Sequence, residues 1–155
     1  MKRTFFSLAL LLAVATLTAQ TKMTAREAAV KIADRILAST TYEFKNTKTG
    51  EIYKSVKKLP LDMDVKVACK YNNWHYTNGV TNMALMELGD KLGDKKYEKY
   101  VLKNMNFVFN EGNLDFFRKQ YDEAFKRDGW NAVRKLSWHM IFRGKRLDDN
   151  GPMGA

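Results

Sequence analysis

Apolar residues recur at helical spacing along most of this 155-residue chain, and this periodicity limits its possible folds more than any other feature. The first such segment, residues 24–40, begins with Thr24 and has Glu27 three residues later, which predicts a capping box at a helix start. Four further segments show the same spacing: 80–92, 97–108, 114–126, and a last one opened by Gly129 and Trp130 that continues to Ile141. The pattern predicts an all-α fold.

The links between these helices are short. Gly93 is expected to end the helix over 80–92, and Asp94 is expected to cap the next one. A link of one or two residues makes two consecutive helices antiparallel neighbours, so the sequence predicts helical hairpins that follow one another.

Residues 41–73 differ from the helical segments. Alternation in 42–44, a turn at 46–50 and alternation again at Ile52 and Tyr53 predict a short β-hairpin near 42–53. Residues 64–70 read as a brief strand or an extended lead-in to the next helix. A long irregular insertion of this kind usually belongs to a binding face or a rim. Cys69 is the one cysteine, so no disulfide within the chain is possible.

The N-terminus has the pattern of a secretory signal peptide: Lys2 and Arg3, then an apolar run over 5–15 and small residues up to Gln20. We therefore expect residues 1–19 to be removed and residues 20–155 to be part of a single domain, secreted to the periplasm and not membrane-bound. Cleavage lowers Lys plus Arg from 27 to 25 against 17 Asp plus Glu, so the net charge falls from +10 to +8. A basic exported protein favours acidic partners such as anionic polysaccharides over nucleic acid.

Aromatic and amide residues gather where the helix over 80–92 is about to begin. Trp74, His75, Tyr76 and Asn78 offer ring faces for the C–H side of a sugar and donors and acceptors for its hydroxyl groups, so they are candidate substrate-binding residues. An equally good interpretation is that Trp74 and Tyr76 anchor a core at a helix start. The two histidines, His75 and His139, read on their own as ordinary polar or capping residues.

Two adjacent carboxylates, Asp148 and Asp149, precede Gly151, Pro152 and Gly154 near the end of the sequence. Asp is favoured at helix N-caps and Pro in a first helical turn, so a plain cap is the simpler interpretation; a catalytic role is the alternative. The sequence shows no glycine-rich phosphate loop, no zinc-ligand spacing and no Ser/His/Asp order, so we expect neither a cofactor nor a metal.

Three segments in this order carry a family resemblance: 74–80 (WHYTNGV), 92–101 (LGDKKYEKYV) and 147–155 (LDDNGPMGA). Together they resemble the unsaturated glycuronyl hydrolases of glycoside hydrolase families 88 and 105, exported enzymes that act on pectin-derived oligosaccharides. The resemblance implies an (α/α)6 barrel, a ring of six helical hairpins, of which this chain supplies the first hairpins. Because such enzymes are much longer, it also implies a truncated domain that is inactive alone.

The activity that the resemblance implies is hydration of the C4–C5 double bond in a terminal unsaturated uronic residue, which yields a hemiketal that opens and releases the sugar. Asp149, with Asp148 as the alternate, matches the supporting carboxylate, and the principal acid lies beyond Ala155. Trp74 and Tyr76 match aromatic residues of the pocket wall. The alternative is a non-catalytic helical module that binds acidic glycans through its basic surface.

Overall fold

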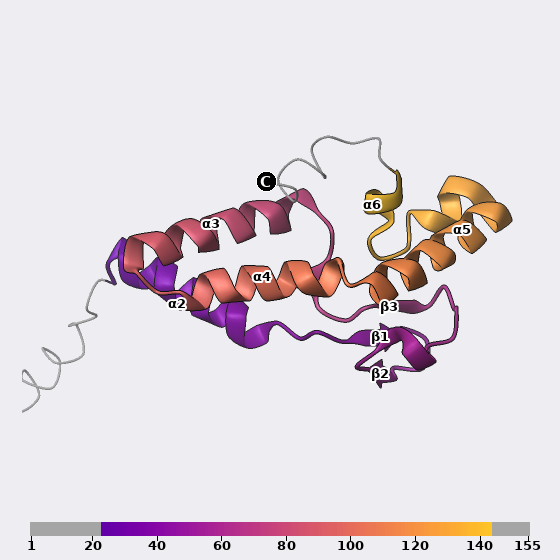
Figure 1. Ribbon diagram of the computed structural model, residues 1–155, viewed down its shortest axis with the longest axis horizontal. Helices are drawn as coiled ribbons and strands as arrows, with labels where there is room; N and C mark the ends of the chain where they lie inside the picture. Colours follow the sequence, from indigo (N-terminus) through magenta and orange to yellow (C-terminus); the bar gives the residue numbers. More distant parts are fainter. Residues whose placement is uncertain (1–22, 144–155) are drawn as a thin grey trace, which may run out of the picture. The chain divides into compact units, whose positions relative to one another are not determined.

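The computed structural model describes residues 23–143. The chain divides into two compact units, residues 1–31 and residues 32–155. Candidate residues Asp148 and Asp149, and the expected signal peptide, lie outside the described residues. The described part is mostly helical with a small three-stranded sheet (Figure 1). None of the helices in 23–143 combines the length and hydropathy that crossing a membrane requires.

In the first unit, the start of α2 (Ala25–Ser39) confirms the predicted capping box. The Thr24 hydroxyl oxygen accepts the Glu27 backbone N–H at 3.2 Å, and Glu27 Oε2 accepts the Thr24 backbone N–H at 2.8 Å. These two bonds satisfy donors that a helix start otherwise leaves without partners.

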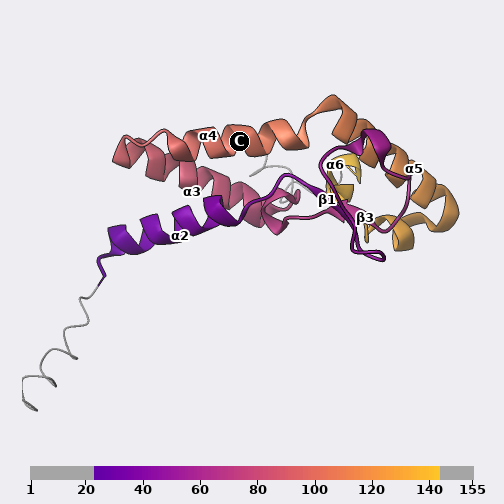
Figure 2. The ribbon, with the colours of Figure 1, turned by 90° about the horizontal axis from the view of Figure 1, so that it is seen from below.

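In the second unit, α3 (Tyr76–Leu92) and α4 (Lys96–Val108) form the predicted helical hairpin and run side by side in both views (Figures 1 and 2). Gly93 ends α3 with φ +65°, a left-handed conformation that glycine adopts without steric cost. Asp94 Oδ1 then accepts the Lys96 N–H at 3.0 Å, although the N-cap residue of α4 is Lys95, one position after the predicted cap. Gly89 allows the backbone at Asp94 to lie close to α3, since a Cβ at position 89 would lie 3.2 Å from the Asp94 carbonyl oxygen.

The core of this hairpin also includes residues 32–39 of α2. Tyr97 is fully buried, and its hydroxyl donates to Asp34 Oδ1 at 3.0 Å. Lys96 Nζ lies 2.9 Å from the same oxygen. Hydrogen bonds from Lys96, which has the larger effect, and from Tyr97 lower the pKa of the Asp34 carboxyl below its ordinary value. The buried residues of this cluster are Ala33, Leu85, Tyr97, Tyr100 and Val101.

The sheet has the order β2-β1-β3, with all pairs antiparallel. Strands β1 (Phe44–Asn46) and β2 (Ile52–Tyr53) confirm the predicted hairpin, with Phe44 opposite Tyr53. Residues 64–70 do contain a strand, β3 (Val65–Val67), which pairs with the other side of β1. Two short 3-10 helices flank β3, Val56–Lys58 before it and Lys70–Asn72 after it. The prediction of an all-α chain is therefore too simple, because the insertion forms a sheet of its own.

Helix α5 (Glu111–Val133) packs against this sheet through aromatic side chains. The ring of Phe117 lies 5.7 Å from Phe44 and 4.7 Å from Trp138, measured between centroids. Gln120 Nε2 donates to the carbonyls of Asp62 and Val65, which fixes the loop before β3 to the helix. The buried residues of this cluster are Phe44, Val65, Trp74, Val108, Phe117, Trp138 and Met140.

The predicted last helix, opened by Gly129 and Trp130 and continuing to Ile141, is wrong as one element. Gly129, with φ +50°, breaks the helical path within α5, and the chain leaves the helix after Val133 and starts α6 (His139–Arg143) only at His139. Between them Trp138 adopts φ +56°, and its indole N–H donates to the Asn72 carbonyl at 2.7 Å. Ser137 Oγ accepts the Val67 N–H at 3.0 Å. These tertiary bonds override the helical spacing of the sequence.

Candidate functional site

A hollow of about 290 Å³ lies where the segment before α3 meets the end of α5 and α6. All three tryptophans and both histidines of the sequence line it, although they come from positions 74–75 and 130–139. The complete lining is Asn73, Trp74, His75, Trp130, Leu136, Trp138, His139, Met140 and Arg143. Trp and His are the residues with flat rings that also carry a polar N–H, so they suit a ligand with both apolar and polar faces.

The three tryptophans have different roles. Trp138 is 1% exposed and its N–H is bound to Asn72, so it forms a fixed base to the hollow. Trp74 is 7% exposed and packs edge-on against Phe109 at 5.3 Å. Trp130 is 37% exposed and is thus the ring most accessible to a ligand.

A cation accompanies the exposed ring. The guanidinium carbon of Arg143 lies 3.9 Å from the centroid of the Trp130 ring, a close cation–π contact. His139 packs against the same ring at 5.6 Å. Among the described residues that line the hollow there is Arg143 but no Asp or Glu, so its field favours an anionic group.

Hydrogen bonds indicate different tautomers for the two imidazoles. His139 Nδ1 lies 2.7 Å from the Leu136 carbonyl oxygen, which requires a proton on Nδ1 and leaves Nε2 an acceptor in the neutral ring. His75 Nδ1 accepts the Thr77 backbone N–H at 3.4 Å and caps α3, so its neutral ring carries the proton on Nε2. The hollow thus has one imidazole that can accept a hydrogen bond and one that can donate.

The structure brings together two of the four candidate binding residues. Trp74 and His75 line the hollow, whereas Tyr76 and Asn78 do not. Tyr76 is 46% exposed as the first residue of α3, with its ring 5.1 Å from the His75 ring. Asn78 Nδ2 donates to the carbonyls of Lys70 and Asn73 at 2.8 and 2.7 Å, so it braces the segment that carries Trp74.

Sequence reasoning missed Trp130, His139 and Arg143 as members of the site. The available signal was their spacing: His139 and Arg143 are four residues apart, hence on one face of α6, and an aromatic residue precedes them. The break between Val133 and His139 turns this face towards Trp130, and helical periodicity alone did not indicate that break.

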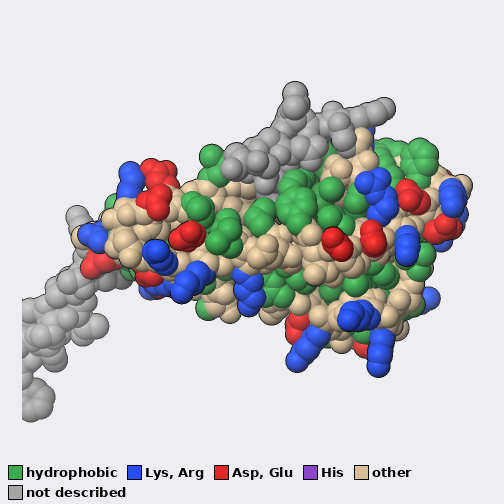
Figure 3. Space-filling view, in the orientation of Figure 1, with side chains coloured by type: hydrophobic (Ala, Val, Ile, Leu, Met, Phe, Trp, Pro, Cys, Tyr) green, Lys and Arg blue, Asp and Glu red, His purple; other side chains and the backbone are tan. Residues whose placement is uncertain are grey.

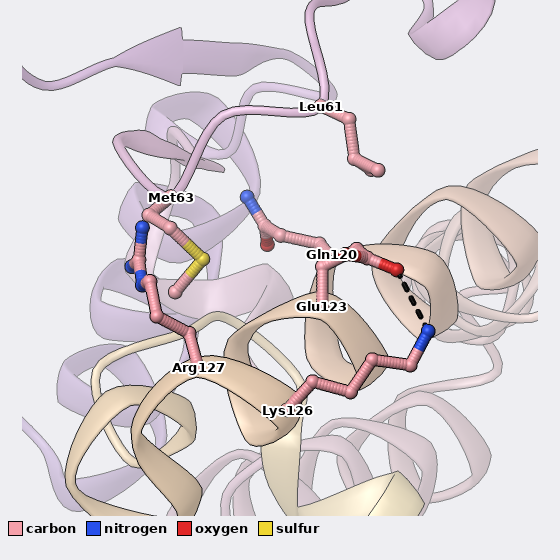
Figure 4. A pocket seen from close by; sticks show the side chains of 6 residues that line it. All are labelled: Leu61, Met63, Gln120, Glu123, Lys126 and Arg127. Atoms are coloured by element: carbon pink, nitrogen blue, oxygen red, sulfur yellow. Dashed lines mark hydrogen bonds and ion pairs between the residues drawn. The ribbon is translucent and has the colours of Figure 1, made fainter.

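A second hollow, of about 310 Å³, lies between the loop before β3 and α5 (Figure 4). Its Lys126 already pairs with Glu123 at 3.0 Å, and the figure shows these two side chains pointing towards each other. Gln120 at its base holds the loop through its amide. Two of its four polar side chains, Glu123 and Lys126, are therefore already paired with each other.

No described residues form a group of three or more His, Cys, Asp or Glu side chains that could hold a metal ion. On the face seen in Figure 3, Lys and Arg side chains are scattered among acidic and apolar ones, and apolar side chains follow α3. Searches against protein-family models, curated proteins and solved structures give no match.

Proposed function

We propose that the tryptophan-lined hollow binds a uronic acid sugar and that this chain is the N-terminal part of an unsaturated uronyl hydrolase with an (α/α)6 barrel. The observation that carries the proposal is the convergence of every tryptophan and histidine of the sequence on one hollow with Arg143. The exposed Trp130 ring would stack on the sugar, and the Arg143 guanidinium would bind its carboxylate.

The sequence supports the chemical part of the proposal. Asp148 and Asp149 follow Arg143 by only five and six residues, in the segment that most resembles the hydrolase family. In this account Asp149 is the supporting carboxylate of a double-bond hydration, and the principal acid belongs to a later hairpin. The described residues contribute substrate binding, and turnover needs the hairpin that carries that acid.

Tryptophan fluorescence tests the binding step without any label, because every tryptophan of the chain lines the hollow. A 4,5-unsaturated uronic disaccharide should change the emission saturably, and a neutral disaccharide of the same size should bind more weakly. Trp130→Ala should weaken binding roughly three- to tenfold, followed by calorimetry. Phe125→Ala is the matched control, since Phe125 is 54% exposed on α5 and lies outside the hollow. Equal affinity for the two disaccharides would contradict the proposal.

The second candidate, a glycan-binding module without catalysis, is favoured by the basic balance of the chain, 27 Lys plus Arg against 17 Asp plus Glu. Loss of the ultraviolet absorbance of the double bond separates the two. We expect turnover in a protein that joins this chain to hairpins supplying the principal acid, and a fall of about 10² to 10⁴ in Asp149→Asn. Asn caps helices nearly as well as Asp, so the fold should survive. Binding without turnover in that joined protein would favour the module.

A further inference from the structure

Another hollow, of about 410 Å³, lies between the end of α2 and the segment after β3. Its polar lining consists of Arg35, Ser39, Thr41, Cys69, Lys70 and Tyr71. Arg35 and Lys70 are exposed, whereas Cys69 is buried at 9% and forms part of the wall. The hollow is therefore an open surface with two cationic side chains and several hydroxyl groups.

The charge of this hollow is not balanced by carboxylates. Among residues 23–143, neither Arg35 nor Lys70 forms an ion pair, and no Asp or Glu lines the hollow. The contrast is with a hollow beside β3, of similar volume, where Asp62, Asp64 and Asp128 offset the cations. A guanidinium and an ammonium without a competing acid are suited to an oxyanion. The Ser39 hydroxyl already donates to the Arg35 carbonyl at 2.7 Å, so the two cations provide the attraction.

The segment over 69–75 connects this hollow to the tryptophan-lined one. Its first residues, Cys69 and Lys70, line the cationic hollow, and Trp74 and His75 line the other. Asn72, between them, is 1% exposed, and its Nδ2 donates to the Thr41 carbonyl at 2.7 Å.

Three further hydrogen bonds make this segment rigid. The Asn72 carbonyl accepts the Trp138 indole N–H, and Asn78 holds the carbonyls of Lys70 and Asn73. At the rise of a 3-10 helix, Lys70 and Asn73 are separated by roughly 6 Å along the segment. The two hollows are therefore lined by neighbouring stretches of one rigid segment.

We propose that the hollow with Arg35 and Lys70 is a second subsite, which binds a carboxylate or sulfate ester of an acidic oligosaccharide whose terminal sugar occupies the tryptophan-lined hollow. The link between the two sites rests on the proposed function, whereas oxyanion binding at Arg35 and Lys70 does not. Both cations are exposed, so each contributes about a two- to fivefold gain in affinity.

Cys69 provides a direct readout, because it is the one cysteine of the sequence and lies in the wall of this hollow. The probe is an unsaturated uronic disaccharide with a sulfate ester on its second sugar, compared with the unsulfated disaccharide and with inorganic sulfate alone. The sulfated disaccharide should slow modification of the Cys69 thiol at lower concentration than inorganic sulfate. Arg35→Gln and Lys70→Gln should each reduce this protection, whereas Lys48→Gln, an exposed lysine outside the hollow, should retain it.

Several results would overturn the subsite: no protection by the sulfated disaccharide, protection that the Arg35 and Lys70 variants retain, or equal protection by inorganic sulfate. Tryptophan fluorescence in the same samples keeps the two proposals apart. A fluorescence change without thiol protection rejects the subsite and leaves the proposed function standing. Thiol protection without a fluorescence change supports oxyanion binding at Arg35 and Lys70 and rejects the uronic site. Circular dichroism melts of the variants verify that they are folded.

Discussion

Two regions of the second unit are built in different ways. The hairpin region, consisting of α3, α4 and residues 32–39 of α2, has a core of side chains at helical spacing. The aromatic region, consisting of the sheet, α5 and α6, has a core drawn from Phe44, Phe117 and Trp138, which lie far apart in the sequence. The hairpin region is organised by local periodicity and the aromatic region by tertiary contacts.

The candidate site belongs mainly to the aromatic region. Trp130, Trp138 and His139 meet there because the chain breaks its helix after Val133 and turns back at Trp138. A departure from helical spacing is therefore what assembles the hollow, and its strain is compensated by the bond from Trp138 to Asn72. The candidate site thus lies where local and tertiary preferences disagree.

The largest expected effect is on the aromatic core. Phe117→Ala should lower the free energy of unfolding by about 3–5 kcal/mol, because Phe117 is 1% exposed and contacts the rings of Phe44, Phe116 and Trp138. Urea unfolding followed by far-ultraviolet circular dichroism measures it. Phe125→Ala, on the exposed side of the same helix, should change stability by less than about 0.5 kcal/mol. If both variants lost a similarly small part of the free energy of unfolding, the aromatic cluster would not be a main source of stability.

A smaller effect is expected where α5 holds the loop before β3. Gln120→Leu keeps a similar volume but removes the amide that donates to the Asp62 and Val65 carbonyls, at a cost of about 1–3 kcal/mol. The Asp62 carbonyl still accepts the Val65 N–H at 3.2 Å, so the Val65 carbonyl bears most of this cost. The substitution also removes Gln120 Oε1, a buried oxygen that has no hydrogen-bond partner within the described residues, and this offsets part of the lost stability. Chemical denaturation measures the change, and a variant as stable as the parent would mean that packing alone fixes this loop.

In the hairpin region, Gly93→Ala should cost about 1–2 kcal/mol, since Gly93 has φ +65° and an added Cβ makes the left-handed conformation unfavourable. Among residues 23–143, apart from its chain neighbours, nothing lies within 4 Å of that Cβ, so the cost is one of backbone conformation and not of crowding. Gly93→Asn is the control, because Asn tolerates this conformation better than Ala. Thermal melts should rank the parent first, Asn second and Ala third; equal melts would show that the turn can relax.

The smallest expected effect concerns the Asp34 ion pair. Lys96 and Tyr97 lower the pKa of Asp34 in the folded state, so the carboxylate adds stability above its unfolded-state pKa, and this stability is lost as the pH falls through the folded-state pKa. Asp34→Asn should therefore melt below the parent at neutral pH, with a difference that closes in acid. If the difference in melting temperature between the parent and Asp34→Asn stayed the same at acid pH, the charge of Asp34 would not be the cause of that difference.

The sequence predicted the parts of the fold that local rules determine. The capping box at Thr24 and Glu27, the αL glycine at Gly93 and the hairpin over 42–53 depend on residues close together in the chain. It did not predict the turn at Trp138, because the bond that stabilises it joins positions 66 residues apart. Trp74 is buried in the aromatic core, as the anchor interpretation predicted, and it also lines the hollow, where its role in binding a sugar stays a prediction.

For the site, the sequence indicated Trp74 and His75 but not Trp130, His139 and Arg143, whose position depends on that same turn. The proposed roles of Asp148 and Asp149 stay predictions from the sequence segment that contains them.

The most direct test of the central claim is the NMR spectrum of the indole N–H groups, which should show three signals, one for each tryptophan. On titration with an unsaturated uronic disaccharide, we expect the Trp130 signal to shift saturably and most strongly, since its ring is exposed beside Arg143. Trp138, which is 1% exposed and bound to Asn72, should shift least. Assignment by the Trp130→Phe variant identifies the signal. Three unchanged indole signals at saturating disaccharide would contradict the account.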